Sequence, residues 1–205
     1  MPPLSQHPIL HQSFALIDQE IGPHPFSPQE YAILRRIVHT TADFEFAQLL
    51  QISSGAIAAG ITALQGGAPL VVDVGMVRQG CQGMVQRTFG NPLWTAVELV
   101  AVAAPGKTRT ETGLLNAWEQ WPEAVYVIGN APTALQALCD RLEQAPVVPP
   151  LVIGVPVGFV GVLEAKQRLA ALAVPQIRVA GRKGGSTVAA AIVNALLVLA
   201  WEALP

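Results

Sequence analysis

Residues 124–135 read AVYVIGNAPTAL, a short and almost wholly apolar run that ends in a glycine-containing turn and leads into a helical pattern. Such a strand suits the interior of a parallel sheet, because helices on both faces of the sheet bury both sides of each strand. Similar runs are found at 69–74, 95–103, 151–155 and 177–180, and all but the first are followed by a turn and a helix. The sequence therefore predicts a three-layer α/β/α fold with five parallel strands.

The first 66 residues are expected to be helical. The stretch 27–39, SPQEYAILRRIVH, begins like a capped helix, since Ser27 can accept a hydrogen bond from the first turn, Pro28 presets φ and Glu30 reaches back. Further helices are expected at 43–51 and 54–66. Because no repeat or linker separates the two parts, residues 1–205 are interpreted as one domain, with a helical N-terminal segment at 1–66 and an α/β sheet core at 67–205.

The composition is that of a compact globular protein, with 51% hydrophobic and 13% charged residues. A net charge of -2 gives no support to a nucleic-acid binder or a polybasic membrane binder. Cys81 and Cys139 are interpreted as reduced packing residues. The apolar run at 188–201 is shorter than the roughly 20 residues of a membrane span, and no signal peptide is recognised at the start, so we expect a cytoplasmic protein.

The turns that follow the strands are the expected place for a ligand, because open α/β sheets bind ligands beyond the carboxyl ends of their strands. Glycines in these turns let backbone N–H groups approach a ligand, and the helix N-termini behind them favour anions. Two interpretations of the basic residues stay open: sparse charges collect in loops without a functional reason, or these residues bind a ligand with several carboxylates or phosphates. Of the 12 Lys and Arg residues, eight lie on the opening helix, in these turns or just beyond the first turn: Arg35, Arg36, Arg78, Arg87, Lys107, Arg109, Arg182 and Lys183.

Arg36 and His39 are the first candidate pair for chemistry. They are three residues apart on the predicted helix, so they share a face and can meet one bound molecule together. His39 is also the only histidine beyond residue 24. A histidine at a helix end can be structural or catalytic, and the helix alone leaves both readings open.

Several familiar reaction classes find no motif in the sequence. The segment GRKGGS at 181–186 lacks the spacing of a phosphate-binding Walker loop, and no strand is followed by G-x-G-x-x-G. His7 and His11 have helical metal-ligand spacing, but Pro8 lies between them and no carboxylate or Cys completes a site, so no metal site is predicted. Asp73 is interpreted as a turn or cap residue. One ionisable group among anion binders indicates proton transfer within a single bound molecule, which favours an isomerase.

A series of motifs in one order along the chain resembles a known family. The motifs are SFA at 13–15, RIVH at 36–39, GAP at 67–69, TRT at 108–110, GNAPTAL at 129–135, PVGFVG at 156–161 and GRKGGS at 181–186. Together they resemble the precorrin-8X methylmutase family, which includes the cobalt-precorrin-8 methylmutases of cobalamin biosynthesis. The likeness covers nearly the whole chain, and GNAPTAL and PVGFVG are its most specific parts.

The resemblance implies a flavodoxin-like sheet, a homodimer and migration of a methyl group from C-11 to C-12 of a tetrapyrrole, the corrin precursor. It implies that His39 is the proton donor and acceptor and that Ser13 and Arg36 contact the substrate. With the chemistry of the turns, this gives a hypothesis in which Arg36, Arg109 and Lys183 pair with substrate carboxylates. Ser13, Asn130 and Thr133 are expected to donate hydrogen bonds, and Ser186 is a further expected contact. No cofactor is expected, although the substrate itself can carry cobalt.

Two departures from the family pattern and two alternatives stay open. Thr110 stands where many members have Ser, and the stretch after Met76 follows the family loosely, which leaves the roles of Arg78 and Arg87 undecided. A non-catalytic tetrapyrrole-binding or carrier protein is the alternative function. A flavodoxin-like module for FMN would need a Ser/Thr-rich phosphate loop and a flanking aromatic residue, and the stretch 73–80 has neither.

Overall fold

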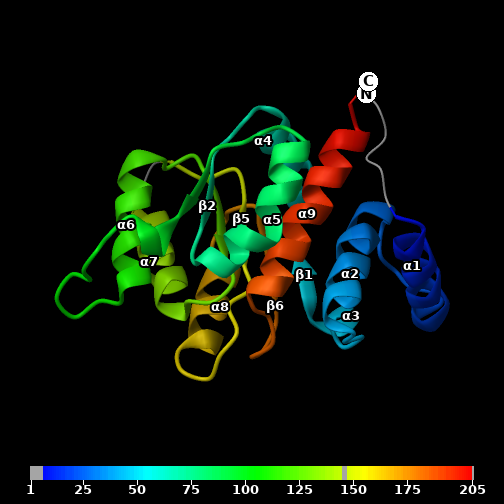
Figure 1. The fold of residues 1–205 in the computed structure, drawn as a ribbon. Coiled ribbons are helices and arrows are strands. Elements are labelled where there is room, and N and C mark those ends of the chain that lie inside the picture. The colour runs from blue at the N-terminus through cyan, green and yellow to red at the C-terminus, as the bar shows by residue number, and fades with distance from the viewer. Residues whose placement is uncertain (1–6, 145–146, 205) are drawn as a thin grey trace.

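The computed structural model describes residues 7–144 and 147–204, and in these residues it has a central sheet between two layers of helices (Figure 1). The sheet has six strands in the order β1-β6-β5-β4-β2-β3. All neighbouring strands are parallel except β1 and β6, which are antiparallel. The strands are β1 (Leu50–Ile52), β2 (Leu70–Val72), β3 (Leu93–Thr95), β4 (Val125–Ile128), β5 (Val152–Gly154) and β6 (Gln176–Val179).

The five parallel strands have the flavodoxin order, in which the first strand lies between the second and the third. The three-layer α/β/α prediction is therefore confirmed. The order reverses between β2 and β4, so the carboxyl ends of these two strands form the switch point where such sheets bind ligands. Asp73 follows β2 directly, and Asn130 is the second residue after β4.

The strand count of five was wrong, because an additional strand closes one edge of the sheet. β1 pairs with β6 through Leu50 and Val179, inside a stretch that we expected to be helical up to residue 51. That helix, α3 (Phe46–Leu49), is only four residues long. A three-residue edge strand is too short for a period-2 pattern to stand out, and only its pairing with β6 distinguishes it from the helix before it.

Two other segments near the sheet differ from the prediction. The strand expected at 95–103 is β3, which ends at Thr95; a 3₁₀ turn, η1 (Ala96–Glu98), follows and Val102 beyond it is exposed. An unpredicted helix, α5 (Gly75–Arg87), follows β2. Its glycines hide the helical signal, but they serve packing: a Cβ built on Gly80 would lie 2.6 Å from the Cβ of Ala190 on α9.

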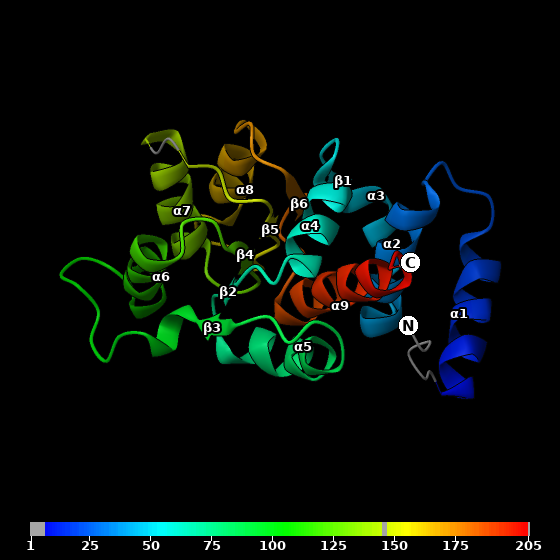
Figure 2. The same ribbon diagram turned by 90° about the horizontal axis from the view of Figure 1, so that it is seen from above.

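The helices divide into two layers because alternate strand residues face opposite sides. Val72 and Val127 pack with one apolar cluster that includes α2, α4, α5 and α9. Val71 and Tyr126 pack with the other, which includes α6, α7 and α8 (Figure 2). The helices are α1 (Pro8–Ile21), α2 (Pro28–Thr41), α4 (Ala56–Gln65), α6 (Arg109–Gln120), α7 (Pro132–Gln144), α8 (Val162–Ala170) and α9 (Ser186–Glu202).

Helix α9 is the centre of the larger layer. Twelve of its 17 residues are buried, and it packs against α2, α4 and α5. This confirms the prediction of a buried helix at the end of the chain. Helix α1 packs on α2 and lies at the outer side of the molecule (Figures 1 and 2). Across the described ranges, no helix has the length and hydropathy that a bilayer crossing requires.

Candidate active site

Helix α2 presents its polar face to α1 because its apolar face is buried. Ser27 caps the helix by accepting from the backbone N–H of Glu30, whose side chain accepts from the backbone N–H of Ser27, as predicted. Leu34 and Ile37 are fully buried in the cluster that contains α9. The intervening positions therefore turn Arg35, Arg36 and His39 outward, and Ala42 ends the helix in the left-handed region with φ of 52°.

The ring of Phe14, on α1, gathers three of the polar side chains of α2. The Cζ atom of Arg35 lies 4.3 Å from the ring centroid and that of Arg36 lies 5.8 Å from it. The imidazole of His39 meets the same ring edge-on, with 5.5 Å between centroids and 82° between planes. Because Phe14 is itself buried, it fixes the positions of groups that otherwise reach solvent.

The two neighbouring arginines of α2 differ in their partners. Arg35 donates to Asp18 at 3.0 Å, and the hydroxyl of Tyr31 donates to the same carboxylate at 2.6 Å. The side chain of Arg36 has no hydrogen bond or ion pair within the described residues. Burial, and then the charge of Arg35, lowers the pKa of Arg36. The guanidinium of Arg36 therefore keeps its donors for a ligand.

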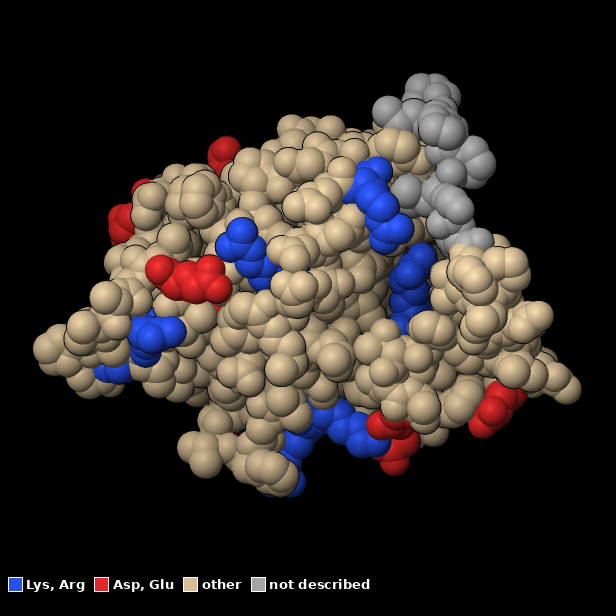
Figure 3. Space-filling model, in the orientation of Figure 1, with Lys and Arg blue, Asp and Glu red and all other residues tan. Residues whose placement is uncertain are grey.

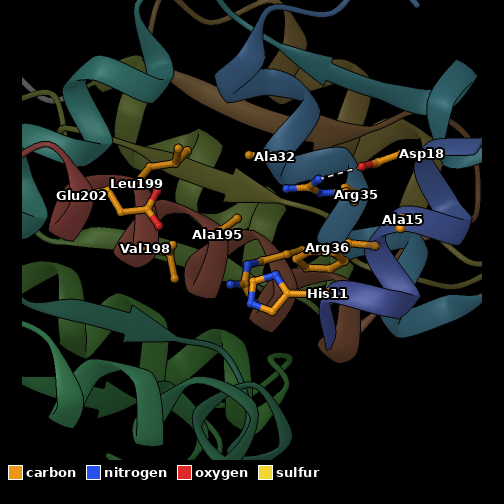
Figure 4. A pocket seen from close by; sticks show the side chains of 11 residues that line it. His11, Ala15, Asp18, Ala32, Arg35, Arg36, Ala195, Val198, Leu199 and Glu202 are labelled. Atoms are coloured by element: carbon orange, nitrogen blue, oxygen red, sulfur yellow. Dashed lines mark hydrogen bonds and ion pairs between the residues drawn. The ribbon is translucent and has the colours of Figure 1, made fainter. Parts of the chain in front are cut away.

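A cavity of about 390 Å³ opens between α1, α2 and the C-terminal half of α9. Arg36 and His11 point into it from two helices, and Glu202 reaches in from α9 (Figure 4). Figure 3 shows the same hollow beside α1 with a basic side chain in its wall. Phe14 lines the cavity, whereas His39 lies beyond the lining residues and is exposed. The cavity is at the small end of the 300–1,000 Å³ typical of small-molecule sites, so it would hold one edge of a large ring.

At the switch point of the sheet, Asp73 holds the turn after β4. Its buried Oδ2 atom accepts from the backbone N–H of Asn130 at 2.6 Å and from that of Ala131 at 2.9 Å. Burial raises the pKa of Asp73, and these backbone donors oppose that rise. The prediction of a turn or cap residue is confirmed. The side chain of Asn130 is exposed and has no hydrogen bond within the described chain.

The starts of α6 and α7 lie side by side. Thr108 caps α6 together with Glu111, as predicted, and its hydroxyl lies 3.0 Å from that of Thr133 on α7. Arg109 is exposed and has no intramolecular partner among the described residues. Ser186 is buried at the first turn of α9, next to where a Cβ on Gly129 would lie. This edge of the sheet therefore offers Arg109, Asn130 and Thr133 together.

The structure gives Lys183 a different setting from the one predicted. Its ammonium contacts Asp43 at 2.5 Å and also Glu45, so its charge is already balanced by two carboxylates. The neighbouring Arg182 is exposed and lies 5.9 Å from the centroid of the Phe159 ring. The sequence holds no signal that separates these two adjacent cations, because the difference depends on acidic residues far away in the chain, of which Asp43 is 140 positions distant.

The free cations form a small set. Of the 12 Lys and Arg residues, all but Arg36, Arg109 and Arg182 make a hydrogen bond or an ion pair to another part of the described structure. Arg78 pairs with Glu98 at 3.4 Å, and Arg87 donates to the carbonyl of Gly83 at 3.1 Å. Both residues therefore have intramolecular partners within α5 or beside it. No three His, Cys, Asp or Glu side chains gather as a metal site in residues 7–144 and 147–204.

The predicted site residues thus fall into two groups on the molecule. Arg36 and His39 lie around Phe14 where α1 meets α2, and Ser13 precedes Phe14 on α1, whereas Arg109, Asn130 and Thr133 lie at the starts of α6 and α7. Lys183 links the β6–α9 loop to the connection between α2 and α3. In Figure 1 this connection and the loops after β5 and β6 share the lower side of the molecule.

Comparison with known proteins gives a consistent result. A family model described as precorrin-8X methylmutase matches residues 8–199. A cobalt-precorrin-8 methylmutase from Synechocystis is 57% identical, over 96% of this chain and 97% of that protein. A precorrin-8X methylmutase from Pseudomonas aeruginosa is 39% identical over 92% of this chain and 93% of its own length.

The solved structures agree with the sequences. The crystal structure of a precorrin-8X methylmutase from Thermus thermophilus superimposes with a TM-score of 0.89 at 44% identity, and covers 95% of this chain and 96% of that one. The residues that the family model matches, 8–199, include the whole sheet and both groups of site residues. The chain described here belongs to the precorrin-8X methylmutase family.

Proposed function

We propose that this chain moves a methyl group from C-11 to C-12 of a corrin precursor, with His39 as the proton donor and acceptor. The substrate is precorrin-8X or its cobalt-containing counterpart, since relatives carry both names. The observation that carries the proposal is the arrangement around Phe14, where an exposed imidazole lies beside an unpaired guanidinium at the rim of a cavity.

The proposed reaction requires the protein to exchange one proton with the ring and to hold the substrate in a fixed position. Protonation of a ring nitrogen beside the migrating carbon favours the tautomer from which a [1,5]-sigmatropic shift can proceed. The methyl group leaves C-11 as its bond to C-12 forms, and the proton then returns to His39, so product and substrate are isomers. Histidine suits this exchange because its ordinary pKa lies near neutral pH.

The substrate edge carries acetate and propionate groups, and the three unpaired arginines would bind them. Arg36 would hold a carboxylate in the cavity, and Arg109 and Arg182 would hold others along the carboxyl edge of the sheet. Ser13, Asn130 and Thr133 would donate hydrogen bonds. Ser186 is buried in the first turn of α9, so it would contact only a part of the substrate that reaches this turn. Lys183, with two carboxylate partners of its own, would act on the loop and not on the substrate.

Catalysis is separated from simple carriage by counting turnovers. With substrate in excess, the absorbance change of an enzyme continues far beyond one equivalent, whereas that of a carrier stops at one. We expect many turnovers for the native chain and a rate about 10²–10⁴-fold lower for His39→Ala, the usual contribution of a general acid–base group. His7→Asn, at the exposed start of α1 and outside the cavity lining, serves as the control and is expected to keep most of the rate.

Two results would contradict the proposal. An undiminished rate in His39→Ala would remove the role of the imidazole, and a stop at one equivalent in the native chain would favour the carrier. Homodimerisation stays a prediction, and sedimentation of the native chain tests it.

A further inference from the structure

Lys166, on α8, is a buried cation that the proposed reaction does not use. The residue is only 4% exposed, and in the described part of the chain its ammonium contacts no carboxylate. It donates instead to the carbonyl oxygens of Gly181 at 2.8 Å and of Lys183 at 2.6 Å. Lysine is rarely buried without a charged partner, because the ammonium loses its hydration. The burial of this ammonium therefore needs an explanation, and the two carbonyls that it binds indicate where to look.

Both carbonyls belong to the β6–α9 loop, and other contacts fix the same loop. The backbone N–H of Gly185 donates to the carbonyl of Val155 at 2.8 Å. Gly184 has a φ of +145°, and a Cβ on it would lie 2.2 Å from the oxygen of Val155. The loop is thus pressed against the end of β5, and Lys166 holds it at two further points.

The loop is in turn connected to the helix that carries His39. Lys183 contacts Asp43 at 2.5 Å and also Glu45, in the connection after α2. Asp43 follows His39 by four residues, and its backbone N–H donates to the hydroxyl of Thr41 at 3.3 Å. That hydroxyl donates to the carbonyl of Ile37 at 2.8 Å, so the connection is bonded directly to the last turn of α2.

We propose that Lys166 is a positioning residue for His39. By holding the carbonyls of Gly181 and Lys183, it places the side chain of Lys183, which fixes the His39 end of α2 through Asp43 and Glu45. Lys166 itself does not touch the substrate. This role rests on the proposed function, because it matters only if the position of His39 determines the rate.

The first test replaces Lys166 by Met, which keeps the length of the side chain and removes its donors. We expect kcat per folded site to fall about tenfold, since small displacements of a reacting group cost rate steeply. KM is expected to change less than kcat, because Arg36 and Arg109 lie on other elements and only Arg182 belongs to the loop that Lys166 holds. Folded sites are counted by titration with the corrin product. The matched control is Arg168→Met on the same helix, which removes ion pairs to Asp140 and Glu143 and should leave kcat unchanged.

The second test asks whether Lys166 acts through Lys183. Lys183→Met should lower kcat to a similar extent, and the Lys166→Met/Lys183→Met double variant should be no slower than the slower single variant. Two losses that multiply, or a native kcat in Lys166→Met, would overturn the positioning role. If Lys166→Met does not fold, Asp43→Asn/Glu45→Gln interrupts the same contacts at the exposed end, and an undiminished kcat there overturns it equally.

The outcomes separate this inference from the proposed function. If His39→Ala loses turnover while Lys166→Met keeps it, only the positioning role fails. If His39→Ala keeps turnover, the catalytic role of His39 fails, and the positioning role of Lys166 fails with it.

Discussion

Two regions of this molecule hold their polar groups in opposite ways: the buried layer beneath the carboxyl edge of the sheet, and the junction of α1 with α2. At the carboxyl edge of the sheet, Asp73 and Lys166 are buried, and their hydrogen bonds go to the backbone of neighbouring turns. Where α1 meets α2, Arg36 and His39 surround Phe14, and neither has a hydrogen-bond partner within residues 7–144 and 147–204. The comparison teaches that buried groups fix the shape of the site, whereas the groups left unpaired are the ones available to a substrate.

The buried side of the comparison is tested most strongly at Asp73. Asp73→Ala would leave the backbone N–H groups of Asn130 and Ala131 without an acceptor, at a cost of roughly 1–3 kcal/mol each. We expect the free energy of unfolding to fall by about 3 kcal/mol, measured by urea denaturation. Asp73→Asn keeps an acceptor oxygen and is the control. If the free energy of unfolding fell equally in both variants, the hydrogen bonds from these two backbone N–H groups would not account for the stabilisation by Asp73.

Lys166, in the same buried region, should make the free energy of unfolding depend on pH. Burial lowers its pKa from 10.5 to about 8, so the folded chain releases this proton at lower pH than the unfolded chain does. The unfolded state therefore binds more protons between about pH 8 and 10.5, and this group makes the protein more stable as pH rises through that range. Relative to Lys166→Met, the free energy of unfolding of the native chain should rise by about 2 kcal/mol over this range. The figure takes about 1.36 kcal/mol per pKa unit and allows for partial solvation of the ammonium.

Subtracting the variant is essential in that experiment, because other groups titrate in the same range with the opposite sign. Burial raises the pKa of Cys81 to about 11 and that of Cys139 to about 12. These thiols make the folded state less stable at high pH. If the difference in unfolding free energy between the native chain and Lys166→Met does not change with pH, Lys166 is solvated in the folded chain.

The unpaired side of the comparison is tested with two adjacent arginines. Arg36→Met should raise the Kd for the corrin product about tenfold or more, because a hydrogen bond to a charged group is worth roughly 1.5–3 kcal/mol. Arg35→Met should change it by less than about threefold, since Arg35 is occupied by Asp18. Both constants can be measured by absorbance titration. Equal effects would show that the Asp18 pair does not set the two arginines apart.

The stability cost of Arg35→Met should be the smallest of these effects. Its ion pair with Asp18 is partly exposed, at 29% and 40% of the two side chains. Pairs of this kind contribute about 0–1 kcal/mol. A larger loss would mean that the contact between Arg35 and Phe14 holds α1 in place.

The sequence predicted those parts of the fold and site that depend on near neighbours. The capping boxes of α2 and α6 are local, since Ser27 and Glu30, like Thr108 and Glu111, are three residues apart. The strands at 124–128, 151–155 and 177–180 were recognisable because a strand buried on both faces is continuously apolar. The edge strand β1 and the glycine-rich helix α5 carry weak local signals, so both were missed.

What the sequence by itself determined is the layered α/β/α class, the helix that carries Arg36 and His39, and the motifs that place the chain in its family. Only the tertiary structure decided which charges stay free. Each of two adjacent pairs of cations has one member that is paired and one that is free. Folding brings Asp18 to Arg35 but not to Arg36, and Asp43 to Lys183 but not to Arg182. Helix period and strand burial are set by neighbouring residues and can be read along the chain. Pairing depends on groups that meet only when the sheet and its helices close around a common core.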